Sequence, residues 1–217
     1  MAGRQEIVIY GGGGSAREIA FLCEAAPNMY EVVAFVDDNP AAQNTYLNNI
    51  PVMRLDDAQA RFPTARMVGG VGSPGLRQKL MQKAAAAGFD FASVIDPNIQ
   101  LSDWLEIGPG AVICAGTILT WDIKLGAHVQ LNVHCSVHHD AVLGDYTTLA
   151  PGARITGNVH TGQRVYLGTN AVIIQGTPDE PMVIANDTVI GASACVTKPI
   201  TEPGLTWVGV PARPLRH

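Results

Sequence analysis

From residue 95 to residue 196, an aliphatic side chain returns at almost every sixth position. A helix repeats at about 3.6 residues and a lone strand at about two, so neither explains this spacing. A hexapeptide repeat is typical of a parallel β-helix, in which each hexapeptide forms one short side of a triangular coil. We expect the aliphatic side chains to point into the narrow prism. The series is Ile95, Leu101, Ile107, Ile113, Leu119, Leu125, Leu131, Val137, Leu143, Leu149, Ile155, Thr161, Leu167, Ile173, Ile184, Ile190 and Val196, in which only Thr161 is polar.

The residue four places after each aliphatic is usually small or β-branched, and we expect it to occupy the tight corner of the coil. One interruption separates Ile173 from Ile184. Its extra segment, 177–181 (TPDEP), carries prolines and carboxylates and is expected to leave the prism as an extruded loop. The small positions are Ala111, Thr117, Val129, Ala141, Thr147, Ala153, Val159, Ala171, Thr188 and Ala194.

The first ninety or so residues follow a different pattern, in which short apolar strands alternate with helices. This alternation predicts a small parallel sheet covered by helices. We therefore expect a Rossmann-like α/β half domain at 1–92, an all-β parallel β-helix domain at 93–205 and an extended tail at 206–217. The expected strands are 6–10, 31–36, 50–53 and 66–71, and the expected helices are 16–26, 55–61 and 75–87.

A glycine-rich turn follows the first expected strand and opens the first helix. Its pattern, Gly11-x-Gly13-x-x-Ala16, precedes an acidic pair by about twenty residues, which is the spacing of a dinucleotide-binding fingerprint. Glycines let the backbone approach a phosphate, and the helix N-terminus favours its negative charge. A full dinucleotide fold needs two such halves, and the β-helix begins too early for a second. A nucleotide-sugar therefore fits better than NAD, and a glycine turn without a ligand remains the alternative.

Composition narrows the possible partners. The net charge of −5 argues against general nucleic-acid binding, and no apolar run is long enough to predict membrane insertion. The four cysteines show no CxxC spacing, and Cys135 stands at an inward small position, where a buried thiol is expected. A reducing cytoplasm is the expected location.

Three of the six histidines fall within nine residues, from Asn132 to Asp140. A histidine followed by a carboxylate, as in His139-Asp140, can act as a general base. Histidine also simply suits the polar outer positions of a coil, and we favour that interpretation for His134 and His138. The γ-class carbonic anhydrases use the same prism and bind zinc through three histidines. No histidine precedes His128 to supply a third ligand, so no metal is expected.

Over its whole length, the chain resembles the NeuD/PglD family of sugar acyltransferases. The resemblance rests on IVIYGGGGSAREIA, on FVDDNP, on NVHCSVHHDAVLGDYTTLAPGARITGNVHTG and on VIGASACVTKPI with VGVPARPL. It implies a homotrimer of chains that each join a nucleotide-sugar domain to a left-handed β-helix. It also implies acetyl transfer from acetyl-CoA to a UDP- or dTDP-linked aminosugar, with O-acetylation of a sialic-type sugar and a non-catalytic nucleotide-sugar-binding trimer as alternatives.

The resemblance also assigns roles to individual residues. His139 matches the catalytic base, Asp140 the carboxylate beside it, and Asn132 a residue that orients the site. Gly157 matches a glycine whose N–H meets the acetyl carbonyl. The other residues expected in the CoA groove are Gly191, Ala192 and Lys198, and those expected in the nucleotide-sugar pocket are Gly11, Gly13, Gly14, Ser15, Asp37, Asp38 and Ser73.

Three positions depart from the aminosugar N-acetyltransferases of this family. Thr148 and Ser15 each stand where a histidine is common, and Ser73-Pro74 replaces an asparagine pair. The fold and acyl transfer do not depend on these positions. The identity of the sugar and of the nucleotide, and the choice between N- and O-acylation, stay open.

Overall fold

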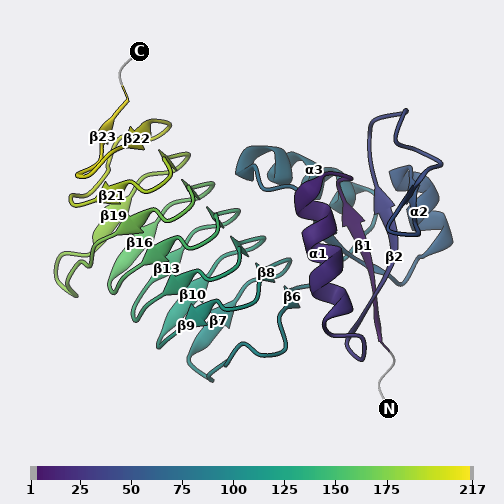
Figure 1. The fold of residues 1–217 in the computed structure, drawn as a ribbon, viewed down its shortest axis with the longest axis horizontal. Helices are drawn as coiled ribbons and strands as arrows, with labels where there is room; N and C mark the ends of the chain where they lie inside the picture. The colour runs from purple at the N-terminus through teal and green to yellow at the C-terminus, as the bar shows by residue number, and fades with distance from the viewer. Residues whose placement is uncertain (1–3, 216–217) are drawn as a thin grey trace. The chain divides into compact units, whose positions relative to one another are not determined.

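The computed structural model of the protein describes residues 4–215. The chain divides into two compact units, Met1–Pro97 and Asn98–His217 (Figure 1). Residues 1–3 of the expected first domain (1–92) and residues 216–217 of the expected tail (206–217) lie outside the described residues. The first unit is an α/β domain and the second is a parallel β-helix, as the sequence predicts.

The first unit is built around one sheet with the strand order β3-β4-β2-β1-β5. All neighbours in it are parallel except β3 and β4, which form a short hairpin that the sequence analysis missed. Strand β1, which pairs with β2 and β5, has Ile7, Val8 and Ile9 fully buried, as expected for a strand covered on both faces. The elements are β1 (Gln5–Tyr10), α1 (Gly14–Glu24), β2 (Tyr30–Val36), β3 (Tyr46–Leu47), β4 (Ile50–Met53), α2 (Leu55–Arg61), β5 (Arg66–Gly69), α3 (Pro74–Ala86) and β6 (Val94–Ile95).

The carboxyl ends of β1, β2 and β5 meet at one edge of this sheet. Strand β2, which follows β1 in the chain, pairs with one side of β1, whereas β5 pairs with the other side. In an open parallel sheet, ligands bind in the crevice at such a reversal of strand order. The fold therefore directs the glycine loop after β1 towards a ready-made crevice.

The second unit stacks short strands into three parallel sheets (Figure 1). Before the interruption, each strand pairs with the strand 18 residues further on, such as Ser136 with Arg154, so three hexapeptides complete one coil. The strands are β7 (Leu105–Ile107), β8 (Val112–Ile113), β9 (Ile118–Leu119), β10 (Ile123–Leu125), β11 (Gln130–Leu131), β12 (Ser136–Val137), β13 (Val142–Leu143), β14 (Thr148–Leu149), β15 (Arg154–Ile155), β16 (Val159–Thr161), β17 (Tyr166–Leu167), β18 (Val172–Ile173), β19 (Met182–Ile184), β20 (Val189–Ile190), β21 (Cys195–Val196), β22 (Thr206–Val208) and β23 (Arg213–Pro214).

The corners of the coil lie one residue earlier than the sequence analysis expected. The small residues four places after each aliphatic, such as Ala141 and Ala153, are buried and point inward. The turn itself is made by the preceding residue, which adopts a left-handed φ of about 50–60° where it is not glycine. Asn and Asp tolerate this conformation best after glycine. The corner residues are Asp122, His128, His134, Asp140, Tyr146, Asn158, Arg164, Asn170, Asp187 and Ser193, together with Gly110, Gly116 and Gly152.

Two members of the predicted series behave differently from the rest. Leu101 is 49% exposed and lies outside any strand. It stands 18 residues before Leu119 of β9, and β9 is already the first strand of its sheet. Thr161, the polar member, is buried and its hydroxyl accepts the Gly144 N–H at 3.2 Å. The prism thus accepts a hydroxyl where the backbone supplies a partner.

Segment 177–181 leaves the coil as a loop, as predicted. It is closed by two hydrogen bonds between Thr177 and Glu180, both at 3.0 Å. Beyond β21, the tail returns to the stack, with β22 parallel to β20 and β23 antiparallel to β22. Within 4–215, no helix is long and apolar enough to cross a membrane.

Candidate functional site

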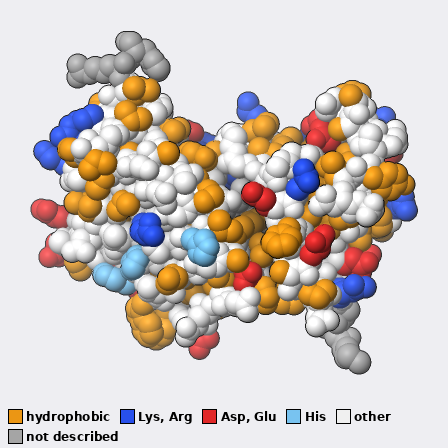
Figure 2. Space-filling model, in the orientation of Figure 1, with side chains coloured by type: hydrophobic (Ala, Val, Ile, Leu, Met, Phe, Trp, Pro, Cys, Tyr) orange, Lys and Arg blue, Asp and Glu red, His pale blue; other side chains and the backbone are white. Residues whose placement is uncertain are grey.

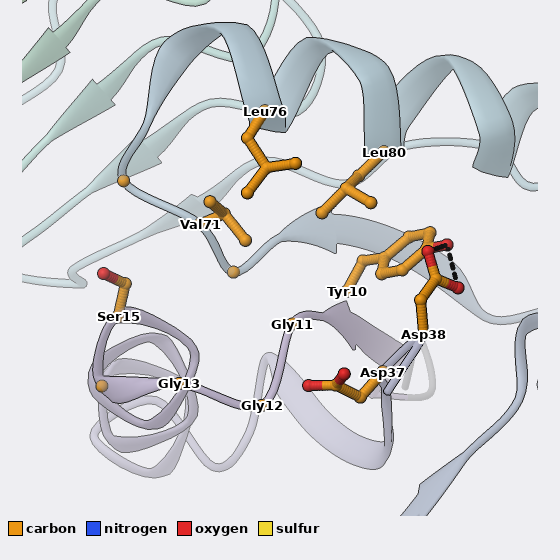
Figure 3. A pocket seen from close by; sticks show the side chains of 13 residues that line it. Tyr10, Gly11, Gly12, Gly13, Ser15, Asp37, Asp38, Val71, Leu76 and Leu80 are labelled. Atoms are coloured by element: carbon orange, nitrogen blue, oxygen red, sulfur yellow. Dashed lines mark hydrogen bonds between the residues drawn. The ribbon is translucent and has the colours of Figure 1, made fainter. Parts of the chain in front are cut away.

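A pocket of about 400 Å³ lies at the carboxyl edge of the sheet in the first unit (Figure 3). The turns after β1, β2 and β5 line it, and so does the first half of α3. One wall is apolar and the opposite side carries backbone and carboxylates. The lining residues are Tyr10, Gly11, Gly12, Gly13, Gly14, Ser15, Asp37, Asp38, Gly70, Val71, Gly72, Leu76 and Leu80.

The glycine loop forms the floor of this pocket for steric reasons. Gly11 has a φ of +125°, and a Cβ there would lie 3.0 Å from the Gly70 carbonyl oxygen. Gly13 precedes α1, whose first turn contains no acidic residue. The first N–H groups of a helix lack intrahelical partners and carry the positive end of its dipole. The loop therefore offers an uncovered helix N-terminus to an anionic group such as a phosphate.

Two adjacent carboxylates occupy the turn after β2, and their surroundings differ. Asp37 faces the glycine loop, since a Cβ added to Gly12 would lie 2.7 Å from its Oδ2. Asp38 instead accepts hydrogen bonds from the Tyr10 hydroxyl at 3.0 Å and from Lys83 Nζ at 2.7 Å. Figure 3 shows Asp37 directed towards Gly12 and Asp38 joined to Tyr10. Only the charge of Asp38 is balanced by a neighbouring cation.

The network of Tyr10, Asp38 and Lys83 holds one side of the pocket in place. The hydrogen bond from Lys83 to Asp38 is the main cause of the raised pKa of Lys83. Burial raises the pKa of the Tyr10 hydroxyl, so Tyr10 remains a donor at neutral pH. The sequence analysis missed Tyr10 and Lys83. The position of Tyr10 at the carboxyl end of a buried strand was the available signal.

Arg77, another residue that the sequence analysis missed, stabilises the turn after β5 through hydrogen bonds. Its buried guanidinium donates to the carbonyls of Val71 at 2.8 Å and of Gly72 at 3.2 Å. Ser73 was expected in the pocket, yet it is exposed at the start of α3 and is not one of the lining residues. Pro74 begins α3 immediately after it, and the pocket is lined further along this helix, by Leu76 and Leu80.

In the second unit, His139 lies on an exposed corner of the β-helix. Its Nδ1 lies 2.7 Å from Asp140 Oδ2, while 55% of its side chain is exposed. Figure 2 shows histidine side chains reaching the surface over the β-helix. A carboxylate on Nδ1 orients the ring, and Nε2 then keeps a lone pair for a proton. This arrangement has the geometry of a general base.

The register of the sheet that contains β12 defines a line of residues along one edge of that sheet, here called the His139 corner. Its members directly precede left-handed turn residues such as Asp122, Asp140 and Asn158. Leu119, Val137, Ile155, Ile173 and Val196 stand side by side in successive strands. The residues two places after them therefore follow one another along the coil. They are Trp121, His139, Gly157, Gln175 and Lys198.

Gly157 directly faces the His139 ring from the next coil. A Cβ at residue 157 would overlap the imidazole, whose Nδ1 would lie 2.9 Å from it. Its carbonyl accepts the Gly176 N–H at 3.0 Å, at the foot of the 177–181 loop. Among the hydrogen bonds of residues 4–215, none uses the Gly157 N–H. An N–H donor next to a candidate base is the element that an oxyanion requires.

Asn132 lies apart from His139 within one chain. It follows β11, and its Nδ2 donates to the Leu149 carbonyl of the next coil at 2.7 Å. The register Leu131, Leu149, Leu167 and Ile190 places Gly191 on the same line, here called the Asn132 corner. This corner consists of Asn132, Ala150, Gly168 and Gly191.

The predicted CoA-groove residues are therefore divided between two edges of one sheet. Gly157 and Lys198 lie on the His139 corner, whereas Gly191 and the exposed Ala192 lie on or beside the Asn132 corner. The sheet containing β12 separates the two lines, because the Ser136–Val137 strand runs between Asn132 and His139. One chain does not bring the four residues together.

Neither His134 nor Thr148 lies on the line of residues that contains His139. His134 occupies the left-handed position beside the Asn132 corner, and its ring faces Gly116. Thr148, where the family often has histidine, is buried in β14. Across the part of the chain that the structure describes, no three His, Cys, Asp or Glu residues are grouped so as to hold a metal ion.

Comparison with known proteins places these features in a family context. Residues 6–84 match the model of the PglD N-terminal domain. The chain is 35% identical to WeeI from Acinetobacter baumannii AYE, with a TM-score of 0.86. That match covers 97% of this chain and 100% of WeeI, so it includes both units.

Two further relatives are associated with a nucleotide-linked aminosugar. PerB from Caulobacter crescentus, solved in complex with CoA and GDP-perosamine, is 29% identical with a TM-score of 0.85 over 97% of both chains. A GDP-perosamine N-acetyltransferase of Escherichia coli O157:H7 is 33% identical over 142 residues, which make up 65% of this chain and 64% of that protein. The chain thus spans less than two thirds of the length of the curated relatives it matches.

Proposed function

The chain belongs to the NeuD/PglD-type family of sugar acyltransferases, and from this premise we propose that it acetylates a nucleotide-linked aminosugar. The acetyl donor is acetyl-CoA and the acceptor is the sugar amine. The observation that carries the proposal is the exposed His139–Asp140 pair, with the Gly157 N–H beside it. We further propose that the enzyme acts in the cytoplasm.

In the proposed reaction, the sugar amine attacks the thioester carbonyl carbon of acetyl-CoA. His139 Nε2 takes the proton that the amine loses, and the Asp140 carboxylate stabilises the resulting imidazolium. The Gly157 N–H donates to the oxyanion of the tetrahedral intermediate. The intermediate collapses to the amide and expels the CoA thiolate, which receives the proton from His139.

A direct transfer without an acyl-enzyme intermediate fits the cysteines of the chain. Cys135, four residues before His139, is buried and its Sγ donates to the Ala150 carbonyl at 3.3 Å. Burial raises the pKa of its thiol to about 11. A thiol that is protonated and enclosed at neutral pH is a poor nucleophile.

For the substrate, we propose that the pocket of the first unit holds the nucleotide diphosphate. The glycine loop and the N-terminus of α1 would meet the phosphates. Asp37 Oδ1 accepts the Asn39 N–H at 2.8 Å, and Oδ2, which faces Gly12, would accept donors from the nucleoside. Two relatives carry GDP-perosamine in their names, so this compound comes before the UDP- and dTDP-aminosugars as a test substrate.

We further propose that the active form is a homotrimer. The predicted CoA-groove residues lie on two corners that one chain holds apart, so a complete groove needs the His139 corner of one copy and the Asn132 corner of another. Contact between two different patches of identical chains closes into a ring when the rotation allows it. Three-fold closure gives three equivalent grooves, each shared by two chains.

A thiol-release assay over GDP-, UDP- and dTDP-aminosugars tests the proposed activity. We expect acetyl-CoA-dependent turnover with at least one of them, and a fall of about 10²–10⁴-fold in His139→Ala. Mass spectrometry of the product separates N- from O-acetylation. Nucleotide-sugar binding without any turnover would instead favour the non-catalytic alternative, and near-full activity in His139→Ala would refute the assigned base.

Mixed oligomers test the shared groove. His139→Ala disables one corner, and Ala192→Trp places a bulky ring on the exposed residue beside the other. Each variant alone should be inactive, whereas co-expressed chains should regain activity, because each mixed trimer contains about one intact groove. Mixed oligomers that remain inactive, or a monomeric mass by light scattering, would contradict the shared site.

A further inference from the structure

Two of the three tryptophans in the chain form an exposed pair on the β-helix. The indole rings of Trp104 and Trp121 stack with their centroids 5.1 Å apart and an angle of 28° between their planes. The two residues remain 57% and 54% exposed. Indoles bury more apolar area than most side chains, so a stacked pair left in water points to an unfilled binding role.

The pair lies directly beside the candidate base. Trp121 precedes His139 by one coil on the His139 corner, because Leu119 pairs with Val137. The backbone continues this register, since the Asp140 N–H donates to the Trp121 carbonyl at 3.1 Å. Neighbouring parallel strands lie about 4.8 Å apart. Trp121 is therefore within reach of any ring whose amine is hydrogen-bonded to His139.

The two sides of His139 along this corner differ in chemistry. On the C-terminal side lie the Gly157 N–H and the cation Lys198, which suit an acyl group and phosphates. On the N-terminal side lie Trp121 and Trp104, which present apolar faces. An acyl donor that occupies the first side leaves the second side for the acceptor.

We propose that Trp121, supported by Trp104, is the wall against which the acceptor sugar packs and that it selects a 6-deoxy aminosugar. This inference rests on the proposed acetyltransferase function. An indole face contacts C–H groups and methyls well, and its one polar group, Nε1–H, lies on the ring edge. A methyl at C6 keeps this contact, whereas a hydroxymethyl brings a hydroxyl that loses water without gaining a partner.

The test compares two acceptors that differ only at C6, GDP-perosamine and GDP-4-amino-4-deoxymannose. We expect the wild type to favour the deoxy sugar by about 10–100-fold in kcat/KM, the range that a hydrophobic site achieves for such a difference. Trp121→Ala should raise the KM for GDP-perosamine about tenfold or more and remove most of this preference. The KM for acetyl-CoA and the oligomer mass should not change, and Trp121→Phe should retain the preference.

Tryptophan fluorescence gives a second measurement that needs no turnover. GDP-perosamine added to His139→Ala should change the emission, and the same titration of His139→Ala/Trp121→Phe should lose most of that change. An unchanged sugar preference in Trp121→Ala would overturn the proposal. So would a smaller oligomer with equal losses on both sugars, since the pair would then cover a subunit contact. If the wild type acetylates no aminosugar, the proposed function fails, while the titration still decides whether Trp121 contacts the sugar.

Discussion

The contact between Gly157 and His139 makes the smallest possible substitution, Gly157→Ala, a sensitive test of the site. Gly157 does not have a left-handed φ, so alanine introduces no backbone strain. Its N–H is retained, and with it any stabilisation of an oxyanion. The added methyl does collide with the imidazole, which is the exposed end of a movable side chain. The variant therefore displaces the base and leaves the fold intact.

The size of the effect follows from the geometry. The added Cβ would lie 2.9 Å from His139 Nδ1 and closer to other ring atoms, whereas non-bonded carbon contacts prefer about 3.5–4.0 Å. The ring must move by about 1 Å, away from the position set by the 2.7 Å contact with Asp140. A misplacement of about 1 Å can cost about 10²-fold in rate, which corresponds to about 2.7 kcal/mol in the activation barrier.

Steady-state acetyl transfer measures this loss, and thermal unfolding reports on the fold. We expect kcat to fall about 10²-fold, while the melting temperature stays within about 2 °C. Gly75→Ala is the matched control, because a Cβ there meets nothing within 4 Å. In a His139→Ala background, Gly157→Ala should cost almost nothing further, since both changes act through one ring. Full activity in Gly157→Ala, or an equal loss in both backgrounds, would refute the reasoning.

Three further predictions concern other parts of the chain. Gly13→Leu should weaken nucleotide-sugar binding and spare CoA binding in calorimetry, because its side chain would occupy the space through which a phosphate approaches the loop. The variant should still fold, since a Cβ at residue 13 meets nothing within 4 Å. Gly11→Ala should instead lower stability, because alanine is strained at a φ of +125°. In the native protein, thiol reagents at about pH 8 should modify Cys195 and leave Cys23, whose pKa is raised to about 12 by burial, unmodified until unfolding. Hydrogen bonds from Arg164 lower the pKa of Asp187 below its ordinary 3.8, so this ion pair stabilises the fold above about pH 4 and loses that effect as the pH falls through the lowered pKa. Asp187→Asn should therefore show a shallower fall in melting temperature between about pH 5 and pH 2, and an unchanged slope would contradict the assignment.

The β-helix could be predicted from the sequence because its core obeys one simple rule. Almost every hexapeptide buries one aliphatic, and residues such as Leu131, Val137 and Ile155 are fully buried as a result. The rule does not say where stacking begins, since Leu101 keeps the period without a preceding coil. It also did not identify the corners, although the left-handed preference of Asn and Asp at 122, 140, 158 and 170 carried that information.

Other features depended on contacts that a periodic pattern does not contain. The hairpin of β3 and β4 turns through Asn48 and Asn49, both with positive φ, which is the requirement of a tight two-residue hairpin turn. The glycine loop and Asp37 were found because their spacing is local and recurrent. Lys83 was missed because it meets Asp38 across 45 residues of sequence. The hydrogen bond between Lys83 and Asp38 could be identified only from the packing of α3 beside the sheet.

The coil itself explains how one fold can carry different substrates. Each corner residue repeats the environment of the residue one coil away, so Trp121, His139, Gly157 and Lys198 are spaced along a line by strand pairing alone. The five extra residues of the 177–181 loop leave this spacing intact, because Val159 still pairs with Met182 across the interruption. The inward aliphatics stabilise the prism, and the outward corner residues contribute little to it. Exchange of a corner side chain can therefore change what binds beside His139 without moving His139, which makes Trp121 a position where specificity can vary independently of the base.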